Sequence, residues 1–207
     1  MSAKTDGRRA AGAETRRRLL AAATELLAER GESGLTLRAV SAAAEANVAA
    51  VQYHFGSREA LVATVVAEAS RPVVEAQLAA LDALPTAPTA AQLIEAWAHP
   101  LIRVAVGTTA EERRLGRIVG QTLAAPLEHL DVRLRELATA PTERLIAGLE
   151  RALPDVGRAE LTLRVALLSS ALAGFASGAF EPWVARSDPE RELEARVLDR
   201  LVRLTTT

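Results

Sequence analysis

The strongest constraint on the fold is the helical spacing of apolar residues near the start of the chain. Between residues 14 and 30, leucine and alanine recur at steps of three and four, which places them on one face of a helix. Gly31 follows and predicts a left-handed cap that ends this helix. Forty-four of the 207 residues are alanine and few are β-branched, so we expect helix almost throughout. The sequence therefore predicts an all-α protein.

Capping residues divide the next stretch into shorter helices. Thr36 precedes residues 37–44, Asn47 precedes residues 48–54, and Ser57 precedes a longer apolar segment. Side chains of this kind accept hydrogen bonds from the free N–H groups at a helix N-terminus. Two short helices joined by a tight turn, after a longer first helix, are typical of a helix-turn-helix motif.

Capping boxes and prolines punctuate the rest of the chain. Thr89 and Thr109 are each followed three residues later by Gln or Glu, so we expect helices to begin there. Pro72 predicts a bend in the helix that follows Ser57, and Pro141 predicts a break between two shorter helices. A long apolar helix is expected over residues 158–180 and a last helix after Asp188, with no strand.

The residue types present argue against an enzyme. There is no cysteine, which excludes disulfides, thiolate zinc sites and cysteine nucleophiles. The three histidines, His54, His99 and His129, are too far apart in sequence to suggest a metal site. No phosphate-binding glycine loop with lysine, Gly-x-Ser-x-Gly or His-Glu-x-x-His motif occurs. We therefore expect no cofactor, no metal and no catalytic site.

The apolar segments are too short to favour a membrane protein. The longest run without charge, residues 165–180, falls short of the ~20 residues that span a bilayer. The basic first 18 residues have no apolar stretch and cleavage site behind them, so no targeting signal is visible. We expect a cytoplasmic protein.

Residues 35–61 carry the most informative motif. Tyr53-His54-Phe55-Gly56 is followed by Ser57-Arg58-Glu59-Ala60-Leu61. In this motif and its spacing, residues 14 to about 68 resemble the TetR-type (tetracycline-repressor-like) family of bacterial transcriptional regulators. The resemblance implies a flexible basic arm (1–13), a helix-turn-helix DNA-binding domain (14–68) and a larger helical domain for effector binding and dimerisation (69–207).

Several of these residues are expected to hold DNA phosphates. The N–H groups and positive dipole end of a helix N-terminus suit a phosphate, and three such ends lie close together in this region. By their match to family positions, Thr36, Arg38, Tyr53, His54 and Arg58 are the expected backbone contacts. The run Arg16, Arg17 and Arg18 is either a solvated charge run or a further contact to phosphate or the minor groove.

Base recognition falls to the exposed side of the second short helix. The expected contacts are Asn47, Ala49, Ala50 and Gln52. A glutamine pairs with adenine, and alanine methyl groups meet thymine methyl groups. Residues 48–54 contain no Lys or Arg, so the commonest guanine contact is missing and we expect A/T-dependent discrimination.

Glu45 departs from the family pattern. It occupies the turn position that normally holds a glycine, and glutamate tolerates a left-handed backbone poorly. Either the turn therefore differs slightly in geometry, or the affinity for DNA is somewhat reduced, because the glutamate charge lies near the DNA.

The second domain is expected to form the dimer. Small residues cluster in residues 169–178, which lets helices approach closely, although packing within one chain is the alternative. In the family the last two helices of each subunit pair into a four-helix bundle. The expected interface is Ser170, Ala173, Gly174, Ser177, Leu193, Val197 and Leu201. A two-fold dimer predicts a palindromic operator with half-sites ~34–36 Å apart.

The effector is expected to be a small, mainly hydrophobic molecule, because only six residues of the chain are aromatic and a pocket would be mostly aliphatic. Large or polar residues on otherwise apolar helices are the candidates: Trp97, His99, Arg103, Gln121, Phe175 and Phe180. The favoured function is a repressor that an effector releases from DNA. Two alternatives stay open: an effector-independent DNA-binding dimer that acts on the nucleoid or at the division site, and a helical carrier of apolar ligands.

Overall fold

A computed structural model describes residues 2–107, 109–124, 132–177, 197–200 and 203. All regular structure in these ranges is helical, which confirms the all-α prediction. The chain divides into two compact units, an N-terminal unit of residues 1–66 and a C-terminal unit of residues 67–207. The boundary between them lies two residues from the one that the sequence predicts.

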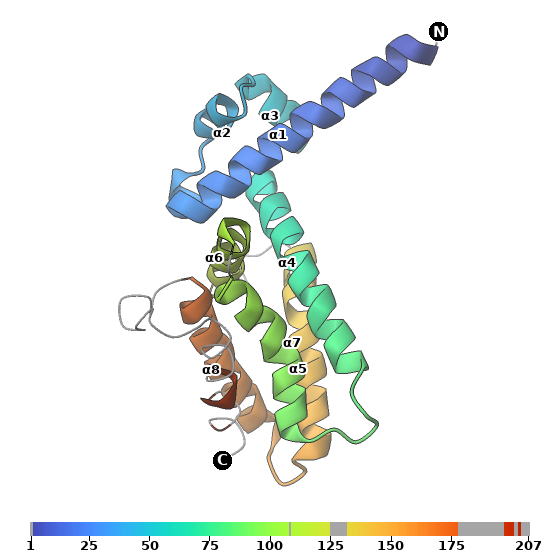
Figure 1. Ribbon diagram of the computed structural model, residues 1–207, viewed down its shortest axis with the longest axis vertical. Helices are drawn as coiled ribbons and strands as arrows, with labels where there is room; N and C mark the ends of the chain where they lie inside the picture. The colour runs from blue at the N-terminus through green and yellow to red at the C-terminus, as the bar shows by residue number, and fades with distance from the viewer. Residues whose placement is uncertain (1, 108, 125–131, 178–196, 201–202, 204–207) are drawn as a thin grey trace. The chain divides into compact units, whose positions relative to one another are not determined.

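The N-terminal unit consists of α1 (Ser2–Gly34), α2 (Leu37–Ala43), α3 (Val48–Phe55) and the start of α4 (Arg58–Asp82) (Figure 1). Both short helices pack on α1 and on each other. The centre of this unit is closed by aliphatic side chains that are buried almost completely: Leu19, Ala23, Leu27, Leu35, Val40, Val51, Leu61 and Val65. This packing fixes the direction in which α3 presents its outer face.

The three predicted N-caps of this unit are present. The Thr36 hydroxyl accepts a hydrogen bond from the backbone N–H of Ala39 at 3.1 Å. Asn47 Oδ1 accepts from Ala50 at 2.7 Å, and Ser57 Oγ accepts from Ala60 at 3.1 Å. The helix bounds differ from the prediction by one residue, since α2 ends at Ala43 and α3 ends at Phe55.

Helix α1 begins earlier than expected. Residues 2–13 are helical where the sequence analysis predicts a flexible arm, and Figure 1 shows this part of α1 running on past α3. Alanine is the strongest helix former and recurs through this stretch, which accounts for the extension. Gly31 has the positive φ that was predicted, with φ 65° and ψ −172°, and interrupts the helix before its last residues. Only glycine adopts this backbone conformation readily.

The C-terminal unit is built from the rest of α4 with α5 (Ala90–Ala105), α6 (Ala110–Ala124), α7 (Val132–Ala152) and α8 (Arg158–Ala176). Helix α5 packs against α6, α7 and α8, and Figure 1 shows α5 and α7 side by side. The core contains Trp97 together with Ile94, Ile102, Leu145, Leu149, Leu161 and Leu172. Residues 197–200 and 203 are also helical.

The helix break predicted at Pro141 is wrong, and two predicted helix starts are confirmed. Helix α4 continues through Pro72, and α7 continues through Pro141. A proline inside a helix costs about 3 kcal/mol, whereas burying one large aliphatic side chain contributes about 1.5–3 kcal/mol. Because Leu145, Ile146 and Leu149 are all buried beyond Pro141, packing outweighs the lost hydrogen bond. The reciprocal capping-box bonds are present at the starts of α5 and α6.

Helix α8 is long and apolar enough to cross a membrane by length and composition, which is weak evidence for a membrane span. Six of its side chains are buried, Ala173 and five others: Leu161, Val165, Leu168, Leu172 and Ala176. Their spacing of three and four residues places them on one face, and α8 packs against α5, α6 and α7. A core helix with one exposed face accounts for its composition.

Candidate nucleic-acid interface

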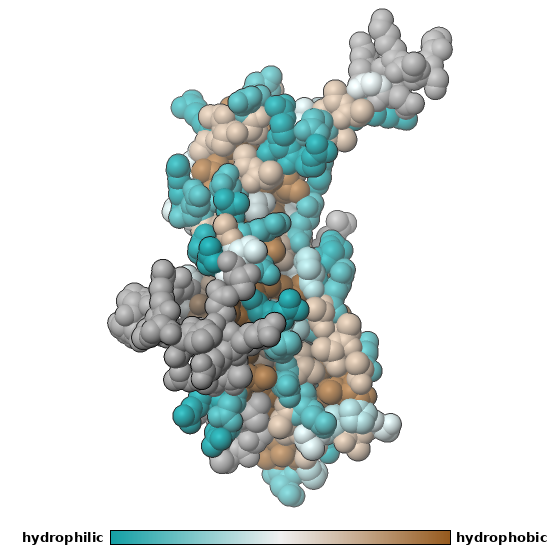
Figure 2. Space-filling model, in the orientation of Figure 1, coloured by the Kyte–Doolittle hydropathy of each residue, from teal (hydrophilic) through white to brown (hydrophobic). Residues whose placement is uncertain are grey.

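The outer face of α3 presents the residues that the sequence analysis assigns to base recognition. Ala49, Gln52 and Tyr53 are exposed, Ala50 is half-buried, and Val51 on the opposite face is buried. Tyr53 is 85% exposed, which is unusual for an aromatic side chain of a folded protein. Figure 2 shows that the visible face of the N-terminal unit mixes hydrophilic and weakly apolar residues, with strongly hydrophobic atoms only in small areas.

Asn47 has a structural task besides any contact with DNA. Its side-chain oxygen accepts the N-cap bond from the Ala50 N–H, and its amide nitrogen can donate to a base. The cap sets the N-terminus of α3, from which Ala49 and Gln52 follow. Val48 is half-buried and Val51 is buried, so both lie on the inner side as their apolar character predicts.

An aromatic cluster lies at the C-terminal end of α3. The rings of Tyr53 and His54 meet edge to face, with centroids 5.0 Å apart, and Phe55 lies 6.4 Å beyond His54. Phe55 is half-buried rather than fully buried, and the Arg16 guanidinium of α1 lies 5.2 Å from the centre of its ring. This cluster connects the end of α3 to α1.

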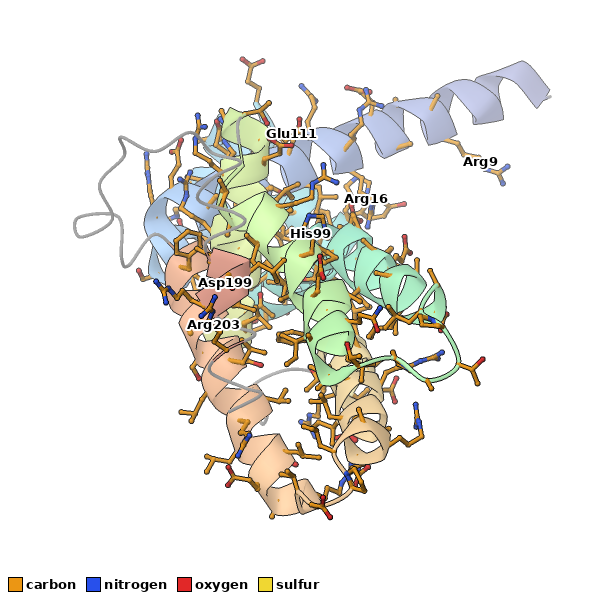
Figure 3. The ribbon with its side chains drawn as sticks, turned by 60° about the horizontal axis from the view of Figure 1, so that its bottom comes forward. Arg9, Arg16, His99, Glu111, Asp199 and Arg203 are labelled. Atoms are coloured by element: carbon orange, nitrogen blue, oxygen red, sulfur yellow. The ribbon has the colours of Figure 1, made fainter. Side chains whose placement is uncertain are left out.

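The basic residues of α1 are exposed beside this cluster. Arg16, Arg17 and Arg18 are all exposed, and Arg17 pairs with Glu14. Further towards the N-terminus Arg9 is also exposed and extends away from the helix (Figure 3). Because Arg16 reaches Phe55, α1 adds positive charge at the C-terminal end of α3.

The N-terminus of α2 contributes a second group of exposed donors. Thr36 and Arg38 are exposed, and the first turn of α2 contains no acidic residue. Free N–H groups and the positive end of the helix dipole favour an anion at such a site. Thr36, Arg38 and the face of α3 thus lie in one compact unit.

Arg58 differs from the other predicted phosphate contacts because its guanidinium is bound to protein. Its Nε donates to the Leu35 carbonyl at 2.7 Å, its Nη1 donates to Glu32 Oε1 at 3.2 Å, and its Nη2 donates to the Glu32 carbonyl. We call this set of bonds the Arg58 clasp. It joins the first residue of α4 to residues 32–35, at the end of α1 and the start of the connector to α2.

Glu59 at the start of α4 is the group here whose acidity is clearly shifted. Its own backbone N–H and the Ser57 hydroxyl donate to the carboxylate, and both hold the pKa of Glu59 below its ordinary value. The neighbouring Arg58 charge acts in the same direction, while slight desolvation opposes it. Hydrogen bonds favour the charged form of a carboxyl group.

The turn between α2 and α3 keeps the left-handed geometry despite its glutamate. Glu45 has φ 49°, and it is the sole non-glycine residue with positive φ in the described part of the chain. The Ala46 N–H donates to the Ser41 carbonyl at 2.8 Å across the same turn. The turn therefore keeps the left-handed geometry, and reduced affinity for DNA stays a prediction.

The residues predicted for the dimer interface divide between two sides of α8. Ala173 is buried and contacts α6, since a β-carbon at Gly120 would stand 2.9 Å from the Ala173 carbonyl and 2.7 Å from the Ser177 nitrogen. Ser170 is exposed and Gly174 is half-buried. Val197 is half-buried against the core of its own chain, while Leu193 and Leu201 lie outside the described residues.

The predicted effector residues differ in burial. Trp97 is buried in the core and Phe175 is half-buried. His99, Arg103 and Gln121 are exposed, whereas Phe180 lies outside the described residues. The structure therefore retains Trp97 and Phe175 as interior positions of the C-terminal unit.

Two polar residues on the inner face of α4 are buried and are not among the residues predicted from the sequence. Ser70 and Gln77 are buried, in a stripe completed by Val73, Val74 and Leu81. The Gln77 amide donates to the Trp97 carbonyl at 2.8 Å. Within the described residues, Ser70 Oγ and Trp97 Nε1 are buried and have no hydrogen-bond partner. Ser70 and Gln77 could have been found from the sequence, because they are seven residues apart and share the helical spacing of the buried apolar residues.

Comparisons with known proteins agree with this architecture. The model of "Bacterial regulatory proteins, tetR family" matches residues 19–65. The model "Tetracyclin repressor-like, C-terminal domain" matches residues 95–206, which is more than half of the chain. No curated protein matches the chain.

Solved structures extend the likeness to nearly the whole chain. A tetR-family bacterial regulatory protein from Rhodococcus RHA1 is 19% identical, with a TM-score of 0.67, 92% of this chain and 96% of that chain covered. A transcriptional regulator from Rhodococcus sp. Rha1 is 25% identical, with a TM-score of 0.58 and 92% and 95% covered. The multidrug binding protein EbrR, solved with malachite green, is 20% identical, with a TM-score of 0.55 and 90% and 96% covered.

The matched family and the two Rhodococcus proteins are regulators rather than enzymes. Their helix-turn-helix model coincides with the unit in which α2 and α3 present the exposed face described above. The second model covers α6 to α8 and most of α5. The chain belongs to the tetR family of bacterial regulatory proteins and is a helix-turn-helix, DNA-binding transcription regulator.

Proposed function

We propose that the chain is a cytoplasmic repressor that binds a palindromic operator as a homodimer and is released by a small, mainly hydrophobic effector. The observation that carries the proposal is the outer face of α3, where Gln52 and Tyr53 are exposed on a helix whose other side is packed into the unit. A helix held in this way can enter the major groove without unfolding any of its packing.

Base recognition in this proposal rests on a short set of small and amide side chains. Gln52 pairs with adenine, Ala49 and Ala50 meet thymine methyl groups, and the free Asn47 amide donates to a base acceptor. α3 carries no Lys or Arg. The operator half-site is therefore expected to depend on A·T pairs at the positions that α3 reaches.

Phosphate contacts surround this helix. Thr36 and Arg38 come from α2, Tyr53 and His54 from the end of α3, and Arg16, Arg17 and Arg18 from α1. Such contacts fix the register of the protein on DNA and carry no sequence information. Each contact makes binding more sensitive to salt, because a neutralised phosphate releases counterions.

Dimerisation is assigned to the exposed apolar side of α8. Leu163 and Leu167 are 55% and 63% exposed, and Ser170 and Gly174 follow at helical spacing on the same side. We call these four residues the α8 stripe. The family dimerises, and a second copy of the same helix covers an apolar stripe of this spacing in an isologous interface. We leave Ala173 and Ser177 out of this proposed interface, because their main-chain atoms lie against Gly120 of α6.

The effector is assigned to the interior of the C-terminal unit near Trp97. Its buried indole N–H lacks a partner among the described residues, and an unpaired buried donor costs about 1–3 kcal/mol. A mainly apolar molecule with an oxygen acceptor would recover this energy. The same reasoning applies to the Ser70 hydroxyl on α4.

Release of DNA is assigned to α4, because this helix runs from Arg58 in the N-terminal unit to Asp82 in the C-terminal unit. An effector that binds more tightly to a conformation unable to contact both half-sites would draw the population towards it. Effector binding would therefore lower the affinity for the operator, as expected of a repressor that its ligand releases from DNA.

The decisive experiment is fluorescence anisotropy with a labelled fragment from upstream of the protein's own gene, at two salt concentrations and with excess random DNA. Saturable binding that resists the competitor and weakens steeply with salt supports a sequence-specific regulator. Binding that random DNA removes equally well contradicts sequence-specific recognition of that fragment. Adding candidate apolar ligands to the preformed complex then tests release, and a complex indifferent to all of them favours an effector-independent DNA-binding dimer.

A further inference from the structure

We propose that Arg58 is a positioning residue for DNA binding rather than a phosphate contact. In this role the clasp fixes the start of α2, and Thr36 and Arg38 contact the DNA in its place. The inference rests on the proposed DNA-binding function, and it departs from the phosphate role that the family resemblance implies for this position.

All three nitrogens of the Arg58 guanidinium donate hydrogen bonds in the clasp. Nε, Nη1 and Nη2 each donate to residues 32–35, and two of the three acceptors are backbone carbonyls. The Arg58 side chain is 29% exposed, while the partner carboxylate of Glu32 is 66% exposed. A planar guanidinium bound in this way has its donor geometry set by the protein, not by a phosphate.

The acceptors explain why this position needs an arginine. The Glu32 and Leu35 carbonyls follow the break at Gly31, where the chain leaves the regular part of α1. The Glu32 carbonyl also accepts from the Leu35 N–H at 3.2 Å, and Arg58 supplies its second donor. Carbonyls at the end of a helix lack the usual intrahelical donor, and Arg58 Nε supplies one to the Leu35 carbonyl. Only the arginine fork reaches two carbonyls and a carboxylate at once, whereas a lysine offers one compact ammonium group.

The position of the clasp determines what it controls. Leu35 is followed directly by Thr36, the N-cap of α2, and Arg38 lies in the first turn of that helix. The clasp joins residues 23 and 26 positions apart, so it fixes the α2 N-terminus relative to α4 within the N-terminal unit. Releasing it frees the connector and lets Thr36 and Arg38 move away from the phosphates they would hold.

The competing role is that Arg58 leaves Glu32 when DNA arrives and pairs with a phosphate instead. The two roles differ in salt dependence. Loss of one phosphate contact lowers the slope of log affinity against log salt by about 0.9. Loss of positioning lowers the affinity and leaves that slope nearly unchanged.

The test compares Arg58→Met with Arg38→Met on the same operator across a series of salt concentrations. The temperature is kept below the thermal unfolding midpoint of each variant. We expect Arg58→Met to weaken binding about tenfold at every salt concentration, with a line parallel to that of the wild type. We expect Arg38→Met to weaken binding with a shallower line. A line for Arg58→Met as shallow as that for Arg38→Met overturns the proposal.

Lysine substitutions give an independent comparison. Arg38→Lys keeps a phosphate-binding charge, so most of the affinity should return relative to Arg38→Met. Arg58→Lys keeps the charge but cannot rebuild the three-sided clasp, so it should bind DNA about as weakly as Arg58→Met. Rescue by Arg58→Lys to near the wild-type affinity would mean that only the charge matters.

Glu32→Gln, with Glu29→Gln as its control, tests whether Glu32 restrains Arg58 from reaching DNA. Both changes remove one exposed negative charge from the end of α1, and a glutamine at position 32 still accepts from Nη1. Positioning predicts equal effects of the two variants on affinity. A gain with Glu32→Gln beyond that with Glu29→Gln shows that Arg58 is released onto a phosphate.

Hydrogen exchange in free protein tests the clasp without DNA. The Ala39 N–H is bound to the Thr36 hydroxyl and the Val40 N–H to the Thr36 carbonyl. Arg58→Met should speed exchange at these two amides severalfold more than Arg38→Met does. Equal protection in both variants overturns positioning. If the wild type binds no specific DNA while Arg58→Met still speeds exchange at these amides, the proposed function is refuted. The structural role of the clasp would then stand.

Discussion

Gly120 on α6 and Ser177 after α8 meet at backbone contact distance: a β-carbon at position 120 would stand 2.7 Å from the Ser177 nitrogen. The Ala173 carbonyl would lie 2.9 Å from the same β-carbon. One turn earlier on α6, a β-carbon at Gly116 would collide with the Val104 carbonyl of α5. Two glycines four residues apart therefore allow α6 to pack closely on α5 and α8.

We expect Gly120→Ala to lower the free energy of unfolding by about 1–3 kcal/mol, because main-chain atoms on α8 must shift to admit a methyl group. The loss should appear even though alanine gains about 1 kcal/mol in helix propensity over glycine. Urea unfolding followed by circular dichroism measures it.

Gly148→Ala on α7 is the matched control. A β-carbon there would meet the Leu93 methyl groups at 2.7 and 3.2 Å, which belong to the end of a flexible side chain. Rotation of Leu93 can relieve this contact, so the gain in helix propensity offsets most of the loss. Equal stability of the two variants would contradict the distinction between backbone and side-chain neighbours.

Glu45→Gly should stabilise the N-terminal unit by roughly 1 kcal/mol. Glu45 has φ 49°, a conformation that costs an ordinary L-residue roughly 1–2 kcal/mol, and the greater freedom of glycine in the unfolded chain takes back part of the gain. Glu45→Gln removes the charge and keeps the strained backbone. If the glutamine variant gains as much stability as the glycine variant, the charge and not the backbone is responsible.

Local chemistry explains which parts of this fold the sequence predicts well. The N-caps at Thr36, Asn47 and Ser57 are bonds between residues three apart, so the sequence alone identifies them. Contacts across long separations escape the same reasoning. Arg58 bonds to residues 23 and 26 positions away, and nothing in the local pattern distinguishes a clasp from a phosphate contact.

The small residues of α8 show a second limit. Ser170, Ala173, Gly174 and Ser177 form one cluster in the sequence, but α8 has leucine on several sides and its apolar pattern does not identify the inner face. Only the packing of Gly120 shows that Ala173 and Ser177 face α6. Pro141 illustrates the converse, since burial beyond it maintains a helix that local propensity would end.

Ser57→Ala should raise the pKa of Glu59 towards its ordinary value, because it removes a hydrogen bond that the carboxylate accepts. Glu59 has a lowered pKa in the folded chain, so its stabilising effect is present above the ordinary glutamate pKa. That effect is lost as the pH falls through the lowered value. Carboxyl chemical shifts over an acidic titration measure both forms, and an unchanged Glu59 midpoint in the variant would disprove the assignment.

Leu167→Glu should convert the proposed dimer into a monomer. Leu167 is 63% exposed in the α8 stripe beside Leu163, and a two-fold interface would bring the introduced charge near its symmetry mate in an apolar contact. Thr162→Glu is the control, since Thr162 is exposed on the same helix outside the stripe. Light scattering at micromolar concentration should give a monomer for the first variant and a dimer for the second. Because a monomer engages one half-site at a time, Leu167→Glu should also lose most of its affinity for a palindromic operator. A Leu167→Glu protein that remains dimeric and keeps its operator affinity would place the interface elsewhere.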